Sequence, residues 1–302
     1  MANELTITSI ADLFASEVIA NEFLYTLAAR DAGFLSHRAI LRFTGNGRSN
    51  VVKVPHLGIG ANLMSPVTPG AEVPNTDLDD DHTDVTVVHR ALRRNVTDLA
   101  RYVAAGKLGP AMWAMDLAVA YAQSQIDLVA NVTDTFTTVE DQTGQPLQWE
   151  DIVSAKATLG AADAEGEMVL LTHPTSWGQL EQDAITQGLA AANNDKAGIV
   201  DQQLGSYKGR WYGVDVYTST RVPTANAGVD YASGLFAPGA VAIADVQLDP
   251  EEGDPDVLDM GRARLERVRQ GTFVSTSYVL SAVFGVSKAI DGAGVTIHSA
   301  AA

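Results

Sequence analysis

Apolar residues recur at helical spacing in two parts of the first half of the chain. Ser9 and Asp12 form a helix-start signal, and the apolar positions from Leu13 onward predict an amphipathic helix that ends near Ala29. Residues 110–132 begin with a proline, which the first helical position tolerates, and continue Ala-rich without a break. Because apolar residues occur on nearly every side of this second helix, we expect other elements to bury it.

Alternating apolar and polar residues predict two strands on either side of a segment rich in Gly and Pro. Residues 50–55 (NVVKVP) and 83–92 (TDVTVVHRAL) show this alternation. Residues 58–81 between them contain repeated Gly and Pro breaks and an acidic run. We therefore expect residues 48–88 to form a long two-stranded excursion whose tip has no core of its own.

The second half of the chain mixes short helical and strand patterns, which predicts an α+β fold. The expected helices are 148–159 and 174–187, and the expected strands are 168–172, 237–246, 272–286 and 294–302. A β-hairpin is expected to pair 206–212 with 214–219 around Tyr212-Gly213. Residues 249–259 read as an acidic linker that faces solvent.

The size and composition of the chain point to two lobes stabilised by burial and by contacts between subunits. At 302 residues the chain is longer than a single hydrophobic core usually supports. It has no cysteine, so neither disulfides nor thiolate metal sites stabilise it. The N-terminus lacks a secretion signal, and no apolar window is long enough to cross a membrane. We therefore expect an intracellular origin and no membrane insertion.

The net charge of −17 argues against a general nucleic-acid-binding module, because such modules present a basic surface to phosphate. In an assembly of many copies, this charge must be paired at the contacts or screened by cations. Two clusters of basic residues leave two interpretations open: salt bridges to the many carboxylates, or contacts of an inward face with packaged nucleic acid. The clusters are Arg93, Arg94, Arg101 and Lys107, and Arg262, Arg264, Arg267 and Arg269.

No residue pattern predicts a catalytic, cofactor-binding or metal site. Gly58-Ile59-Gly60 lacks the following helix of a dinucleotide site, and the sequence has no phosphate loop and no Gly-x-Ser-x-Gly motif. An acidic run could gather a divalent cation but lacks the Gly and terminal Glu of a calcium loop, which favours a solvated charge run; it comprises Asp77, Asp79, Asp80, Asp81 and Asp84. The histidines lack ligand spacing and are expected in structural or surface roles; they are His37, His56, His82, His89, His173 and His298.

Taken in order, these segments resemble a known family. The helical arm and the excursion are followed by HTDVTVVHRALRRNVTDLARYVA, the long Ala-rich helix, VLLTHPTSWGQL, GSYKGRWYGVDVYTSTRVP and APGAVAIADVQLDPEEGDPDVLDMGRARLERV. This order resembles the major capsid proteins of the tailed bacteriophages, whose fold was first named for phage Hong Kong 97. The resemblance covers essentially the whole chain and rests on segment order more than on invariant residues.

The resemblance implies an α+β capsid fold of four parts, in which the hairpin at Tyr212-Gly213 lies where five or six subunits meet around an axis. The implied parts are an N-terminal arm (1–35), an extended loop (36–85), a peripheral domain with a spine helix at 110–132 (86–145 and 248–285), and an axial domain (146–247 and 286–302). It implies no catalytic residue, no cofactor and no metal site.

The resemblance also implies a structural protein that assembles with itself. Hexamers and pentamers would tile an icosahedral shell around a double-stranded DNA genome, which the shell touches weakly and non-specifically. Scaffolding, portal and decoration proteins are the implied partners, with no membrane contact, and the shell would assemble in the bacterial host cytoplasm and persist as the virion capsid. Two alternatives stay open: an encapsulin-like compartment that encloses a cargo enzyme, and an α+β enzyme with an undetected site.

Overall fold

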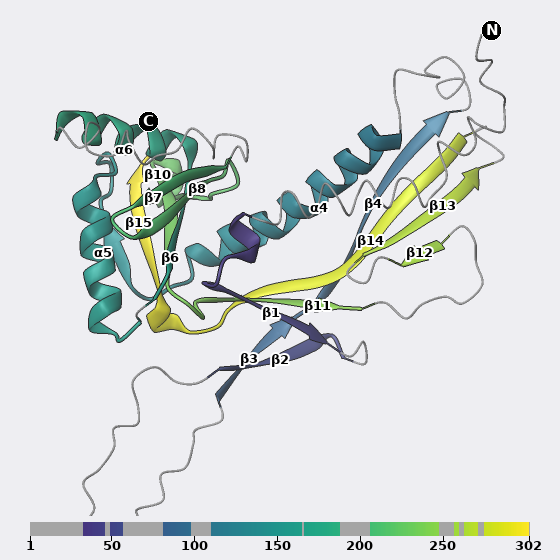
Figure 1. The fold of residues 1–302 in the computed structure, drawn as a ribbon, viewed down its shortest axis with the longest axis horizontal. Coiled ribbons are helices and arrows are strands. Elements are labelled where there is room, and N and C mark those ends of the chain that lie inside the picture. The colour runs from purple at the N-terminus through teal and green to yellow at the C-terminus, as the bar shows by residue number, and fades with distance from the viewer. Residues whose placement is uncertain are drawn as a thin grey trace, which may run out of the picture.

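The chain folds into two lobes that lie side by side along its longest axis (Figure 1). The computed structural model describes residues 33–45, 49–56, 81–97, 110–164, 166–187, 206–247, 257–259, 263–270 and 275–301. Within these residues no helix has both the length and the apolar character that crossing a membrane requires. The expected N-terminal helix, Ser9 to Ala29, lies outside the described residues.

One lobe, here called the elongated lobe, is a six-stranded sheet with a long helix along one face (Figure 1). Its elements are β1 (Ile40–Gly45), β4 (Val88–Thr97), α4 (Pro110–Thr133), β11 (Val241–Val246), β12 (Val257–Asp259), β13 (Arg264–Gln270) and β14 (Ser275–Lys288). β14 is its organising strand, because β4 pairs along one side while β13 and β11 share the other. β1 lies parallel to β11.

The other lobe, here called the compact lobe, is a seven-stranded sheet with two helices. Its elements are β5 (Val139–Asp141), α5 (Trp149–Ala161), β6 (Met168–Thr172), α6 (Pro174–Thr186), β7 (Tyr207–Trp211), β8 (Val214–Thr218), β9 (Thr224–Ala225), β10 (Asp230–Phe236) and β15 (Gly294–Ala300). The strand order is β5-β15-β10-β6-β8-β7, with β9 added to β10. β6 is buried at every position, as its continuous apolar run predicts.

Among the described residues, three of the segments that pass between the lobes meet at one place, where hydrogen bonds link them and the adjoining strand β14. Ala237 N–H donates to the Ala293 carbonyl at 2.8 Å. The Lys288 ammonium donates to the Thr135 carbonyl at 2.9 Å. The joining segments are 134–138, 237–240 and 289–293. Each lobe therefore holds the other through several chain crossings instead of a single linker.

The base of the excursion packs on the elongated lobe. β2 (Val51–His56) and β3 (Asp81–Thr86) pair antiparallel, with His56 opposite Asp81. Val54 and Val85 are fully buried in a small cluster with Ala242 and Ala244 of β11. The two-stranded excursion is thus confirmed at its base, which has a core shared with the sheet, while residues 57–80 lie outside the described residues.

Gly285 allows this base to approach β14. A Cβ added to Gly285 would collide with the carbonyl oxygen of Thr86 at the end of β3. We expect Gly285→Ala to lower the free energy of unfolding by about 1–3 kcal/mol, the usual cost of overpacking, measured by urea denaturation. Gly160→Ala in α5 is the matched control, because a Cβ there meets open space. The control should be neutral or stabilising by up to ~1 kcal/mol, and equal losses in both variants would contradict the proposed close approach.

The sequence predicted α4 at the correct place but overestimated its burial. Its buried positions form one face, and that face packs on the strands; the residues are Leu117, Ala118, Tyr121, Ala122, Gln125, Val129, Ala130 and Thr133. Asp116, Gln123, Ser124 and Asn131 are exposed on the other side. The sequence prediction fails because alanines reflect helix propensity as much as burial, and a single sheet covers only one side of the helix.

Several strand boundaries also differ from the sequence prediction. The strand predicted at 83–92 is two strands, because the chain leaves the excursion at Val87 and pairs with β14 as β4. The strand predicted from Ala237 begins at Val241, since Gly239 adopts a φ of 85° in a turn. The last residues of the predicted acidic linker, 257–259, form β12. β1, β10 and β13 were not predicted, whereas α5, α6, β6 and β15 were.

Candidate functional site

The hairpin that the sequence predicted around Tyr212-Gly213 is confirmed as the pair β7 and β8. Tyr212 and Gly213 have φ values of 50° and 80°. Two successive residues in the left-handed region are typical of the tight two-residue turn whose twist matches the flanking strands. Arg210 lies opposite Asp215, and a bulge interrupts the pairing between Tyr207 and Arg210.

Three tryptophans hold this hairpin against α5 and α6. The Trp149 ring at the start of α5 stacks on Trp211 of β7, with centroids 5.0 Å apart and planes at 17°. Trp177 of α6 meets both rings edge-on, at 6.3 and 6.0 Å. The Trp149 indole N–H donates to the Leu180 carbonyl at 3.1 Å, so its polar atom is satisfied in the core. The cluster fixes the direction of the hairpin.

At the end of the hairpin, the aromatic ring of Tyr212 is exposed to solvent and the Lys156 ammonium lies beside the turn. Lys156 of α5 donates to the Tyr212 carbonyl at 2.8 Å. The Tyr212 side chain is exposed at 46%, and Val153, one turn after Trp149 on α5, is also exposed at 46%. The arrangement offers a contact surface and contains no nucleophile with a base beside it.

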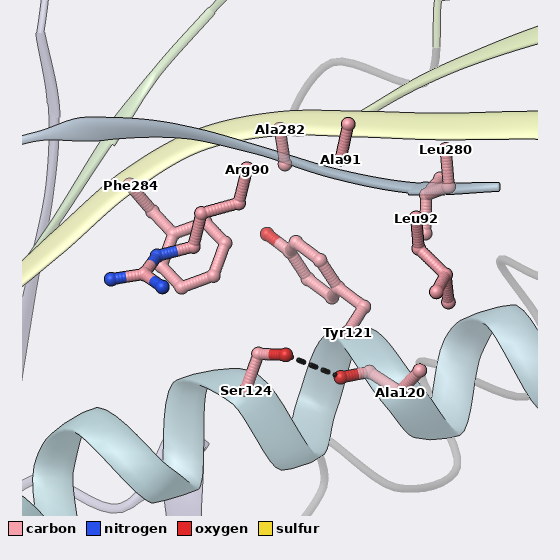
Figure 2. A pocket seen from close by; sticks show the side chains of 9 residues that line it. All are labelled: Arg90, Ala91, Leu92, Ala120, Tyr121, Ser124, Leu280, Ala282 and Phe284. Atoms are coloured by element: carbon pink, nitrogen blue, oxygen red, sulfur yellow. Dashed lines mark hydrogen bonds between the residues drawn. The ribbon is translucent and has the colours of Figure 1, made fainter.

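A hollow lies between α4 and the strands β4 and β14 (Figure 2). It has a volume of about 150 Å³ and is lined mainly by apolar side chains, among them Leu92, Tyr121, Leu280 and Phe284. The Arg90 guanidinium lies 5.4 Å from the centre of the Phe284 ring and is the only charged group of the lining. A single cation over an aromatic ring supports no acid–base chemistry, so the hollow fits an apolar side chain better than a reacting substrate.

A buried polar network links α4, β1 and β11. Gln125 of α4 accepts a hydrogen bond from Arg42 of β1 at 2.5 Å and donates to the Tyr121 hydroxyl at 2.9 Å. Its amide also lies 3.5 Å from the carboxylate of Asp245 on β11. Arg42 and Asp245 come from two different strands, so the network specifies how the helix packs on the sheet.

Three histidines have structural contacts, as the sequence predicted for them. His37 accepts from the Ala39 N–H at 3.1 Å through Nδ1, so its Nε2 faces Asp215 at 3.2 Å as donor. His173 begins α6, and His298 lies between Asp134 and Asp141 at 3.6 and 3.7 Å. His82 and His89 are exposed, and the His56 side chain is outside the described residues.

The part of the chain that the structure describes contains no group of three or more His, Cys, Asp or Glu side chains placed to hold a metal ion. Of the acidic run, only Asp84 has a described side chain, and it lies 3.8 Å from His82. Asp77, Asp79 and Asp80 are outside the described residues.

His173 caps α6 in its neutral form. Its Nδ1 accepts from the Thr175 N–H at 3.2 Å, and its ring stacks on Tyr231 with centroids 3.8 Å apart. Burial lowers the pKa of His173 below its ordinary value of 6.5. Because the pKa of His173 is lower in the folded protein than in the unfolded chain, its neutral ring stabilises the fold at pH values above 6.5. This contribution is lost as the pH falls from 6.5 through the pKa of the folded protein. A protonated Nδ1 can no longer accept the hydrogen bond from Thr175.

We expect the free energy of unfolding to fall more in the parent than in His173→Asn between about pH 7.5 and about pH 5.5, because asparagine caps a helix without titrating. Urea denaturation of both proteins at the two pH values measures this difference. Identical pH dependence in the two proteins would show that His173 does not titrate against the cap.

The two basic clusters of the sequence are brought together across β14. Arg94 of β4 and Arg267 of β13 are both register partners of Tyr278. Arg94 makes a salt bridge of 2.6 Å to Asp116 of α4, so for this residue the salt-bridge interpretation is confirmed. Arg93 donates to the Ser277 hydroxyl at 2.9 Å. Arg101, Lys107 and Arg262 lie outside the described residues.

Comparison with known proteins finds similarity at the level of three-dimensional structure. No family model matches the chain, and no curated protein matches it. A structure from Mycobacterium phage Che8 is 17% identical with a TM-score of 0.57, over 83% of this chain and 85% of that one. The capsid of cyanophage P-SCSP1u is 12% identical with a TM-score of 0.57, over 87% of each chain. The SrpI encapsulin of Synechococcus elongatus PCC 7942 is 13% identical with a TM-score of 0.56, over 86% of this chain and 85% of that one.

The similarity shows the fold. The chain has the α+β architecture that phage capsid proteins and encapsulins share, and the fold expected from the order of its segments is confirmed. The sequence reasoning missed the tryptophan cluster and the network around Gln125, because both join residues that are far apart in the chain. The Trp and Gln residues carry no sequence signal that distinguishes them from ordinary core residues.

Proposed function

We propose that this chain is the major capsid protein of a tailed bacteriophage, a structural subunit that forms hexamers and pentamers of an icosahedral shell around double-stranded DNA. The observation that carries the proposal is a shared fold over more than four fifths of the chain with capsid structures such as that of cyanophage P-SCSP1u. A subunit of this shape has surfaces for contacts, and the sites described above have no convergent catalytic groups.

The parts of the chain have proposed roles in such a shell. The proposed peripheral domain, residues 86–145 and 248–285, takes in most of the elongated lobe with α4 as its spine, and the proposed axial domain, residues 146–247 and 286–302, takes in most of the compact lobe around a five-fold or six-fold axis. Residues 1–35 are the proposed arm, and residues 36–85 the proposed extended loop, whose base contacts β11 of its own subunit. Scaffolding, portal and decoration proteins are proposed partners, and assembly in the host cytoplasm is the proposed route to the virion.

An encapsulin-like compartment is the second candidate, because the SrpI encapsulin has the same fold at a similar TM-score. The two candidates differ in what the shell encloses. A phage shell contains DNA, whereas a compartment contains protein cargo. The arm and the full excursion in the sequence favour the phage shell.

Negative-stain electron microscopy of the purified recombinant protein tests the proposal. We expect hollow particles, or rings of five and six subunits. Compact monomers at every concentration, with a ligand-dependent shift in melting temperature, would contradict it and favour an enzyme. Particles isolated from infected cells then separate the two shells: nuclease-protected DNA of genome length supports the phage capsid, and enclosed protein without DNA supports the compartment.

A further inference from the structure

The sheet of the compact lobe ends in two different strands. In the order β5-β15-β10-β6-β8-β7, strands β5 and β7 are the two edges, and within the described part of the chain each pairs on one side only. The outer side of an edge strand has backbone N–H and C=O groups available for another chain. The two edges are therefore natural places for contact with a second subunit.

The two edges carry opposite charge. β7 contains Lys208 and Arg210, and Lys156 binds the adjacent turn. Residues 134–147, which include β5, contain no Lys or Arg and three carboxylates, Asp134, Glu140 and Asp141. The side chains of Asp134 and Asp141 are exposed at 56% and 65%. In a chain of net charge −17, the β7 edge is thus a local basic surface and the β5 edge a local acidic one.

Arg210 of the β7 edge and Asp141 of the β5 edge lie on the same face of the sheet. The Glu140 carboxylate accepts from Ser154 of α5 at 3.3 Å, so its neighbour Asp141 points to the opposite face because side chains alternate along a strand. In β7 the Trp211 ring faces Trp149 of α5, so Arg210 also points away from α5. Asp134 lies near Asp141, because both carboxylates contact the His298 ring, Asp134 at 3.6 Å and Asp141 at 3.7 Å.

We propose that the β7 edge of one copy docks against the β5 edge of the next copy in a head-to-tail ring, with Arg210 facing Asp134 and Asp141 and Lys208 adding positive charge to the same edge. This rests on the proposed function and names the contact that closes its rings. A two-fold contact of either edge with itself would place like charges together, whereas a head-to-tail contact pairs opposite charges at each interface. Val139 on β5 and Tyr212 beside β7, exposed at 43% and 46%, add apolar area to the two surfaces.

Contacts within the subunit orient these charged groups and leave them exposed: the Arg210 guanidinium donates to the Gly213 carbonyl at 3.5 Å, and His298 lies between the Asp134 and Asp141 carboxylates. Asp215 is the register partner of Arg210, but its carboxylate already accepts from the Tyr207 hydroxyl at 3.1 Å and faces His37 at 3.2 Å. Asp141 accepts hydrogen bonds from the backbone and hydroxyl of Thr143, which orient its carboxylate at the edge. A carboxylate held in place pairs with a cation at a smaller entropic cost than a free one.

Charge reversal of one edge at a time tests the contact. The variant K208E/R210E has two acidic edges, and the variant D134K/D141K has two basic edges. Each alone should weaken ring association by ~100-fold or more, because like charges then meet at every interface. Native mass spectrometry and negative-stain microscopy measure the ring population, and circular dichroism melting shows whether each variant is folded.

Mixing the two variants gives a sharper result. Each interface must then join one variant to the other, so the two alternate around the ring. Alternation closes six-membered rings but not five-membered ones. We expect the mixture to restore hexamers and to lack pentamers, and a chain that carries all four substitutions to form both.

The matched control is R221E, which removes an exposed cation of the same lobe that lies after β8 and not on an edge. It should form rings as the parent does. Folded single-edge variants that assemble like the parent, or a folded mixture that stays dissociated, would overturn the edge contact while leaving the shell proposal intact. A parent protein that forms no rings under any condition would overturn the proposed function and this contact together.

Discussion

Replacing residues 57–80 with Asn-Gly should give a folded subunit that no longer closes into shells. His56 and Asp81 are register partners at the ends of β2 and β3, so a two-residue turn can join them directly. The base keeps its buried contacts, because Val54 and Val85 remain packed on β11. The removed segment is predicted by its sequence to have no core of its own, and a segment of this kind contributes to stability only through a neighbouring subunit.

Two measurements separate folding from assembly in this variant. The free energy of unfolding of the isolated subunit should stay within ~0.5 kcal/mol of the parent, as for surface changes that remove no packed group. Closed particles should be absent by electron microscopy at concentrations where the parent assembles. A length-matched Gly-Ser replacement of the same residues is the control, and it should also fail to assemble, because length without sequence supplies no contacts. Normal particles from the Asn-Gly variant would show that the excursion does not brace its neighbours.

The elements that were predicted correctly carry their signals locally. α4 begins at Pro110 and runs through an unbroken helical sequence, and the β7–β8 hairpin turns at Tyr212-Gly213, where two left-handed residues are needed. These signals depend on backbone preferences of neighbouring residues, which are readable from a single sequence. The order of such segments was enough to indicate the fold.

The features that were missed depend on pairing between distant residues. β13 (Arg264–Gln270) has five charged or polar residues and two apolar ones, without regular alternation, and its sequence indicates a basic cluster until its partner β14 is known. The join between the lobes is another case, since Lys288 reaches the carbonyl of Thr135 across a large separation in sequence. Spacing along the chain holds no information about such contacts, because they are set by which strands lie side by side.

The proposed contact surfaces also combine a local signal in the sequence with a pairing of distant strands. The basic residues on β7 are evident in the sequence. That β7 and the acidic strand β5 form the two opposite edges of one sheet is known only from the strand order. The net charge predicted that closely packed copies must pair opposite charges somewhere. The structure offers a specific pair of surfaces for that pairing.

Trp149→Ala should be among the most destabilising single substitutions in the compact lobe. The Trp149 side chain is 2% exposed, stacks on Trp211 and packs edge-on against Trp177. Its removal therefore leaves a cavity between these two tryptophan rings. It also leaves the Leu180 carbonyl without its indole donor. We expect the free energy of unfolding to fall by about 3–5 kcal/mol, the usual cost of truncating a buried aromatic residue, measured by urea denaturation.

Val153→Ala is the matched control on the same helix. Val153 is 46% exposed, so its truncation should lower the free energy of unfolding by no more than ~0.5 kcal/mol.

The double variant Trp149→Ala/Trp211→Ala should lose less free energy of unfolding than the sum of the two single variants, because each single substitution already breaks the same stack. We expect a coupling energy of about 0.5–3 kcal/mol. Additive losses would mean that the two rings stabilise the lobe independently, and the hairpin would then not depend on α5 for its direction. If the coupling is found, ring assembly should fail in Trp149→Ala even below its melting temperature, because a hairpin without its tryptophan support no longer holds Arg210 at the edge where the next subunit binds.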